Sequence, residues 1–414
     1  MPSAGTLRKG LTENWTPKLW ISIEDYGIWC RLTFDAPVIY SGIMKPPYVL
    51  LRSRAVFFLF AFVFVAVTAT AQVPDRLTDE QFWKLSEAMS EPDGSFRSDN
   101  LLSNELSFQY VIPELLKTAR QERVYMGVGP EQNFSYIVAL KPKMVFIVDI
   151  RHGNLDVHLM YKALFEMSKD RADFVSRLFS RKRLEGLSTK STAIELFEAY
   201  LNVDASKELF DENLKAIGDH LKTKHGFPLS EGDMEGIEWA LGNYYRYGPS
   251  INYNSSITEA APEIVGATGF GRRNGGFGNV TYADLMMADD GDGQFRSYLA
   301  TEENFNFLKD LETRNLLVPV VGDFGGRKAI REVAKYLKSV NATVSAFYLS
   351  NVEQYLSQDG KMGAFMTNIG SLPLDESSTF IRSGNRGFGG GFGRGGLGSE
   401  LGNMLSESKV YTGR

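Results

Sequence analysis

Short, continuously apolar runs alternate with stretches whose apolar residues recur at helical spacing in two parts of the chain. The runs predict buried strands at residues 124–129, 143–149, 316–323 and 343–349, with a fifth near 378–381. Helical spacing predicts helices at residues 131–140, at 328–338 and from 352 onward. Strands that alternate with helices form a parallel sheet joined by right-handed crossovers. The predicted fold class is therefore α/β, a three-layer sandwich with a mainly parallel sheet.

The segment between the second and third strands has a different pattern, because it is helical over most of its length. Helices are predicted at residues 155–178, 192–200, 207–221 and 234–247. This segment is too long for one crossover, so we assign residues 156–279 to a large helical insertion that we expect to roof a ligand cleft. The insertion divides the α/β domain into residues 72–155 and 280–383. The Gly/Arg-rich tail, residues 384–414, cannot pack a core, and we expect it to be disordered.

An uncharged, largely apolar stretch at residues 55–74 precedes these elements. Basic residues come before it and the small residues 69–71 end it, which is the order of a secretory signal peptide. We predict a signal peptide at residues 44–71, cleaved after Ala71, with residues 1–43 as an upstream extension. An uncleaved membrane anchor is the alternative, because the uncharged run approaches the roughly 20 residues that span a bilayer. The expected location is periplasmic or extracellular, or at a membrane through residues 55–74.

Composition narrows the classes of function. The formal net charge is −5, so the chain lacks the excess of Lys and Arg that would neutralise duplex nucleic acid. Its one cysteine, Cys30, excludes an intramolecular disulfide. The sequence contains neither the nucleophile motif of α/β-hydrolases nor a Gly-Lys-Ser/Thr phosphate loop. Because His152 and His158 lack the spacing of two ligands on one helical face, the sequence predicts no metal site.

The residues after the first predicted strand are suited to ligand binding, because ligands bind open parallel sheets at the carboxyl ends of the strands. Gly127 and Gly129 let backbone N–H groups approach a ligand. Glu131 and Asn133 lie at the start of the following helix, whose N-terminal end carries a positive partial charge. We predict that these four residues bind a cofactor.

Acidic residues end the second and third strands. Asp149 lies twenty residues after Gly129, the separation at which a carboxylate accepts the hydroxyls of an adenosine ribose. Asp323 lies beside a glycine turn. We predict that both bind the cofactor, and both have structural alternatives. Asp149 can cap a helix or pair with Arg151, and Asp323 can cap the helix that begins near Lys328.

The fourth strand ends in side chains that can form hydrogen bonds with a ligand. We predict that these side chains contact a small-molecule substrate: Tyr348, Ser350, Asn351 and Glu353.

The first glycine loop, Asp149 and the turn at 322–323 resemble the cofactor half of class I S-adenosylmethionine-dependent methyltransferases, over roughly residues 120–155 and 280–382. The resemblance implies a Rossmann-like fold with S-adenosylmethionine as the cofactor. It places Gly127, Gly129 and Glu131 along the methionine and ribose, Asp149 on the ribose and Asp323 near the adenine. The pair of strands that usually ends this sheet is not evident, so we expect the sheet to end at its fifth strand.

Residues 128–136, 318–326 and 347–356 also resemble a group of bacterial hypothetical proteins without an assigned activity. Two functions follow as hypotheses. The first is S-adenosylmethionine-dependent methyl transfer to an unknown substrate. The second is a non-catalytic exported module that binds a small molecule or a protein.

Overall fold

A computed structural model describes the backbone of residues 20–23 and 28–31, and residues 72–96, 99–255, 280–384 and 398–412. The chain divides into two compact units, residues 1–69 and 70–414. In the first unit, β1 (Trp20–Ile23) pairs antiparallel with β2 (Ile28–Arg31). The predicted signal segment, residues 44–71, lies outside the described residues. In the described part of the chain, no helix combines the length and apolarity that crossing a membrane requires.

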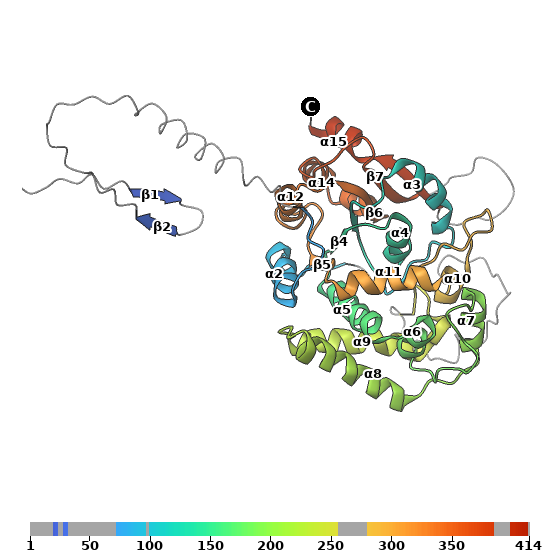
Figure 1. The fold of residues 1–414 in the computed structure, drawn as a ribbon. Helices are drawn as coiled ribbons and strands as arrows, with labels where there is room; N and C mark the ends of the chain where they lie inside the picture. The colour runs from blue at the N-terminus through green and yellow to red at the C-terminus, as the bar shows by residue number, and fades with distance from the viewer. Residues whose placement is uncertain are drawn as a thin grey trace, which may run out of the picture. The chain divides into compact units, whose positions relative to one another are not determined.

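The second unit is built on a six-stranded sheet, as Figure 1 shows. Its strands lie in the order β5-β4-β3-β6-β7-β8, and all neighbours are parallel except β7 and β8. Numbered along the chain within this sheet, the order is 3-2-1-4-5-6, which is that of a Rossmann-like fold. The strand bounds are β3 Val124–Gly127, β4 Met144–Asp149, β5 Leu317–Val321, β6 Val344–Ser350, β7 Thr379–Gly384 and β8 Gly398–Asn403. The prediction of an α/β fold with a mainly parallel sheet is confirmed.

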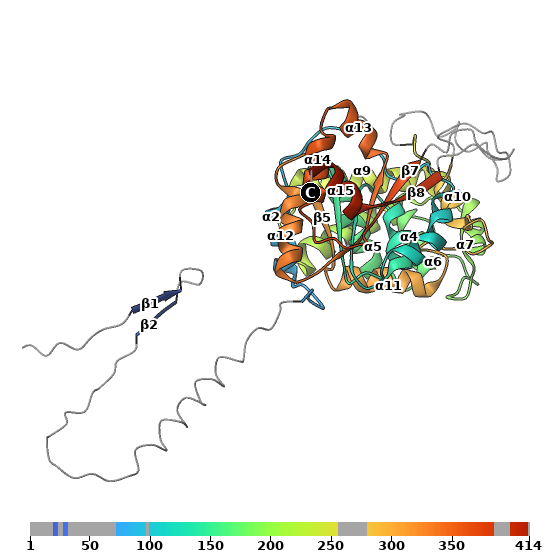
Figure 2. The same ribbon diagram turned by 90° about the horizontal axis from the view of Figure 1, so that it is seen from above.

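Helices cover both faces of the sheet, which explains why the first three strands are buried along their whole length. One layer contains α12 (Ala329–Ser339) and α14 (Met362–Ile369), and the other contains α4 (Gln132–Leu140), α5 (His152–Met167) and α11 (Glu302–Thr313) (Figures 1 and 2). The same unit also contains α2 Asp79–Met89, η1 Phe108–Val111, α3 Ile112–Thr118 and α13 Val352–Gln358.

The segment between β4 and β5 is helical, as predicted. After α5 it contains α6 Arg171–Leu178, α7 Ala193–Leu201, α8 Lys207–Asp219, η2 His220–Lys224, α9 Glu231–Tyr247, η3 Gly248–Ser250 and α10 Tyr282–Met287. Helix α9 packs on α5 and α8 packs on α9, so these helices form a further layer on the outer side of α5 (Figure 1). The segment therefore thickens one side of the sandwich.

The end of the chain differs from the prediction of a disordered tail at residues 384–414. Strand β8 pairs antiparallel with β7 along its whole length, and α15 (Met404–Thr412) follows it. The sequence does not predict this strand, because it is glycine-rich and has no apolar pattern. Backbone hydrogen bonds, which need no such pattern, hold it to β7. Met404 is fully buried and fixes the start of α15. The sheet accordingly has a sixth strand after the fifth, and residues 385–397 lie outside the described part of the chain.

Candidate functional site

A crevice of about 510 Å³ opens at the carboxyl ends of β3, β4, β5 and β6. Its position is the switch point between β3 and β6, where the strand order reverses and where open α/β sheets bind their ligands. The volume lies within the roughly 300–1,000 Å³ of small-molecule sites. Other wall residues come from 95–96, 100 and 102–105, from 351–361, and from Tyr253 and Ser383. Among the described residues of the predicted insertion, 156–255, Tyr253 alone lines the crevice, so the helices of this segment do not supply the covering expected of them.

The loop after β3 lies at the crevice with Gly129, whereas Gly127 and Asn133 shape the loop from behind. Gly129 has a φ of +74°, and a Cβ added there would meet no atom within 4 Å. Gly127 is required for another reason, because an added Cβ would lie 1.8 Å from Oδ1 of Asn133. The Asn133 amide donates to the carbonyls of Val128 (2.9 Å) and Pro130 (2.7 Å). Of these three predicted cofactor residues, Gly129 lines the crevice and the other two hold the loop.

Asp149 lines the crevice at the end of β4 and is bound by Arg151. Its Oδ1 accepts hydrogen bonds from the Arg151 backbone N–H (3.0 Å) and Nε (3.1 Å), and its Oδ2 accepts one from Nη2 (3.1 Å). Both side chains are nearly buried, with 7% and 11% exposed. The predicted ion-pair alternative is therefore present, and Arg151 itself is a crevice residue that the sequence analysis did not select as a ligand.

Asp323 also lines the crevice and has its own cation. Its Oδ2 lies 2.6 Å from Nζ of Lys361, and its Oδ1 accepts the N–H of Gly325 at 2.9 Å. The predicted helix-capping alternative is not what the structure shows. Glu91 accepts the N–H groups of Lys328 (2.7 Å) and Ala329 (2.9 Å) and so caps α12 from a distant part of the chain.

The predicted substrate residues after β6 divide into two groups. Tyr348, Ser350 and Asn351 line the crevice. Ser350 has a φ of +49°, a conformation that costs a non-glycine residue of order 1–3 kcal/mol and that collects at functional sites. Glu353 does not line the crevice. Its carboxylate accepts hydrogen bonds from Nε (2.5 Å) and Nη2 (3.1 Å) of Arg382.

Glu105 is the acidic group on the crevice wall that the sequence analysis missed. It is 2% exposed, and its Oε1 accepts the hydroxyls of Tyr348 (3.0 Å), Ser350 (3.1 Å) and Ser383. Its Oε2 accepts Nε2 of Gln132 at 3.1 Å. This buried carboxylate connects the ends of β6 and β7 to the start of α4. No local pattern marks it, because its partners are far away in sequence.

Glu131 is fully buried but does not line the crevice. No side-chain donor among the described residues reaches its carboxylate, which faces the backbone N–H groups of Glu131 and Ser103. Burial raises the pKa of Glu131 to about 8. Burial raises the pKa values of four surrounding tyrosines, and a negative charge on Glu131 would raise them further: Tyr161, Tyr244, Tyr282 and Tyr298. The predicted cofactor role has no access to the crevice from this position.

An aromatic pair and a histidine complete the site. Phe96 and Tyr355 line the crevice with ring centroids 4.8 Å apart in an edge-to-face arrangement. His158, buried behind the first loop, lies with Nε2 3.0 Å from the carbonyl oxygen of Gly129. Burial lowers the pKa of His158 to about 4, so the neutral ring donates this hydrogen bond. The sequence analysis selected none of these three as site residues, and it considered His158 only as a metal ligand.

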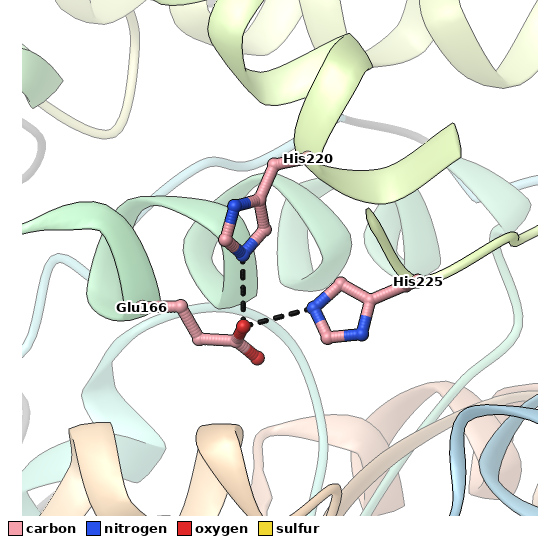
Figure 3. A group of neighbouring side chains, drawn as sticks. All are labelled: Glu166, His220 and His225. Carbon is pink, nitrogen blue, oxygen red and sulfur yellow. Dashed lines mark hydrogen bonds and ion pairs between the residues drawn. The ribbon is translucent and has the colours of Figure 1, made fainter. Parts of the chain in front are cut away.

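Two groups of side chains in the described residues could hold a metal ion. His152, Asp156 and Asp233 form one, with Nε2 of His152 2.6 Å from Asp233 Oδ1 and 3.7 Å from Asp156 Oδ1. Glu166, His220 and His225 form the other (Figure 3). The spacing argument considered His152 with His158, whereas the two imidazoles that the structure brings together are His220 and His225, five residues apart.

A family model described as "Domain of unknown function (DUF7790)" matches residues 101–226 and 280–392, which is more than half of the chain. The chain belongs to this family. The match includes the four crevice strands β3 to β6 and the helices α5 to α8, so those helices are part of the family's domain. The search of curated proteins found no match.

Proposed function

We propose that the protein binds S-adenosylmethionine in the crevice and transfers its methyl group to a substrate held near Tyr348, Ser350 and Asn351. The observation that supports this most directly is the position of Asp149. It is a buried carboxylate at the carboxyl end of the strand next to β3, in a crevice at the switch point, on the same wall as Gly129. A carboxylate in this place can accept hydroxyl groups of an adenosine ribose.

The residues present fit the adenosyl part of the cofactor better than its methionine part. Gly129 offers open space beside its backbone, and Phe96 with Tyr355 offers apolar ring surface for a base. Glu131 and Gly127, which the resemblance places along the methionine, do not line the crevice. A bound S-adenosylmethionine supplies an electrophilic methyl group on its sulfonium. This chain would contribute a ribose acceptor, Asp149, and a binding wall around the substrate.

Binding of a ribose to Asp149 depends on Arg151. Because its guanidinium already donates to both oxygens of Asp149, a ribose must displace Arg151 or share the carboxylate with it. Removing the guanidinium therefore frees the acceptor for the ribose. Removing the carboxylate eliminates charged hydrogen bonds that are worth about 1.5–3 kcal/mol each.

Calorimetric titration of the full-length protein with S-adenosylmethionine and S-adenosylhomocysteine tests the proposal. We expect saturable binding of both, weakened about tenfold or more in Asp149→Asn and strengthened in Arg151→Ala. Glu353→Gln is the matched control, since Glu353 follows β6 but lies outside the crevice, and it should bind as the unmodified protein does. Folded protein that takes up neither ligand, or binding that is indifferent to Asp149→Asn, rules the proposal out.

The Arg151–Asp149 and Lys361–Asp323 pairs favour a second candidate, a non-catalytic module that binds an anionic small molecule. In that case the two cations are the ligand-binding groups and the two aspartates hold them in place. Titration with inorganic phosphate distinguishes this candidate, because Arg151→Ala then weakens binding. Under the methyltransferase proposal the same variant binds S-adenosylmethionine more tightly.

A further inference from the structure

The group formed by Glu166, His220 and His225 lies apart from the crevice, since none of the three lines it. Oε2 of Glu166 is 2.8 Å from Nε2 of His220 and 2.8 Å from Nε2 of His225. Figure 3 shows this one oxygen facing both ring nitrogens. All three side chains are nearly buried, with 3%, 11% and 6% exposed respectively. Two imidazoles and a carboxylate are thus directed at one point.

A local distortion of the helix brings the two histidines together. In an α-helix, residues five apart project about 140° away from each other. Residues His220–Lys224 instead form a π-helical turn, closed by a 3.1 Å hydrogen bond from the His225 N–H to the His220 carbonyl. This wider turn places His220 and His225 on the same side. Single π-turns of this kind occur frequently at functional sites.

The groups behind the three side chains have the arrangement that supports metal ligands. Nδ1 of His225 lies 2.7 Å from Oδ1 of Asp79, as in the carboxylate–histidine–metal pattern. The other oxygen of Glu166, Oε1, lies 2.7 Å from Nζ of Lys162. Lys162 is 1% exposed and is held in turn by the carbonyl of Glu312 at 2.5 Å. Glu166 and His225 therefore each have one polar atom held by a neighbouring side chain and another directed at the shared point.

The contacts of His225 are compatible with a bound metal ion. A neutral imidazole carries one N–H, yet both nitrogens of His225 face carboxylate oxygens. A metal ion bound to Nε2 and to Glu166 leaves the single proton on Nδ1, where Asp79 accepts it. A cation already approaches the same point: Nζ of Lys224 is 3.2 Å from Glu166 Oε2 and 3.3 Å from His220 Nε2. The Lys224 side chain is 60% exposed, so it can move into solvent.

We infer that Glu166 Oε2, His220 Nε2 and His225 Nε2 bind a zinc ion, with water in the fourth position. Histidine and carboxylate ligands in this number suit Zn²⁺, whereas Ca²⁺ and Mg²⁺ select oxygen ligands. Bonds of about 2.0–2.1 Å in tetrahedral geometry separate ligand atoms by about 3.3 Å. From 2.8 Å, Glu166 Oε2 needs to move away from each histidine nitrogen by only about 0.5 Å. The ion would join α5 and the π-turn, with Asp79 at the start of α2 behind them.

The test uses full-length protein that has been stripped of metal with a chelator and dialysed. Zinc is titrated against a chromophoric competitor, and bound metal is measured by elemental analysis after a second dialysis. Cobalt substitution provides a visible spectrum that reports nitrogen and oxygen ligation at low coordination number. We expect one zinc per chain, lost in His220→Gln and in His225→Gln. Asp79→Asn should weaken binding about 10- to 100-fold, the usual effect of removing a supporting carboxylate.

His152→Gln is the matched control, because it removes the histidine of the other candidate group and should leave zinc binding unchanged. Circular dichroism confirms that each variant is folded. The inference is overturned if the unmodified protein binds no stoichiometric zinc, which needs no variant to establish. It is equally overturned if zinc persists in folded His220→Gln and His225→Gln, or is lost in His152→Gln.

Discussion

Two buried glutamates near the loop after β3, Glu105 and Glu131, show how different the surroundings of the same side chain can be. Glu105, on the crevice wall, receives donors from Gln132, Tyr348 and several serines. Glu131 is buried among tyrosines without a side-chain donor, and burial raises its pKa to about 8. Burial alone therefore does not tell how a carboxylate is held in the fold. The donors around it decide.

The comparison also distinguishes the free-energy cost of removing a carboxylate from the cost of ionising one. Removing a carboxylate that has many donors destabilises the fold, because the donors are left without an acceptor. A carboxylate without donors is tolerated when protonated and becomes unfavourable when it ionises. The two residues should therefore respond in opposite ways to substitution.

The largest effect is expected for Glu105→Leu. Five donors lose their acceptor, from Gln132, Tyr348, Ser350, Ser383 and Ser399. At about 1 kcal/mol or more for each donor left unsatisfied, the free energy of unfolding should fall by about 5 kcal/mol. Urea unfolding followed by circular dichroism measures it. A loss below about 1 kcal/mol would mean that water satisfies these donors and that Glu105 does not organise the crevice.

An effect of opposite sign and at most similar size is expected for Glu131→Gln above pH 8. The folded protein keeps its proton up to about pH 8, whereas the unfolded chain loses it near pH 4.5. Between these values the unfolded state binds fewer protons, so stability falls as pH rises. The variant lacks this loss and should be more stable than the unmodified protein at pH 9, by up to about 5 kcal/mol.

Unfolding measured from pH 4 to pH 9 for both proteins gives the test of Glu131. The two curves should lie close together near pH 4 and separate as pH rises. Curves that stay parallel would show that Glu131 has no raised pKa and that its carboxylate has donors in solution. Glu105→Gln in the same series shows whether the response is specific to Glu131.

The sheet could be predicted because its strands are buried on both faces. The apolar runs that become β3, β4, β5 and β6 are continuous, and each is followed by a turn residue, so type and order follow from the sequence. Strand β8 contains Gly398, Gly402 and no apolar run. Its existence depends on pairing with β7, which no local signal records.

The candidate site was predictable only as far as strand ends define it. Gly129, Asp149 and Asp323 come directly from that rule and line the crevice. Glu131 also follows a strand end, but this residue before α4 is fully buried and does not line the crevice. Glu105 follows no strand of this sheet, and its role arises from partners such as Ser383, 278 residues away. Contacts of this kind depend on tertiary packing, which a local pattern cannot contain.

The smallest effect is expected for His158, which lies behind the crevice loop and donates a hydrogen bond to the carbonyl of Gly129. Its pKa is lowered by burial from 6.5 to about 4, so the folded protein keeps it neutral where the unfolded chain protonates it. Stability from this group is therefore present above pH 6.5 and lost as pH falls toward 4. In His158→Gln, whose amide can still donate to Gly129, unfolding should be easier by about 1 kcal/mol at pH 7. The difference should shrink and then reverse toward pH 4, because only the unmodified protein carries the protonation cost, about 3 kcal/mol for the shift in pKa. A difference that stays constant across this range would mean that His158 titrates normally and that Glu131 alone gives the interior its pH dependence.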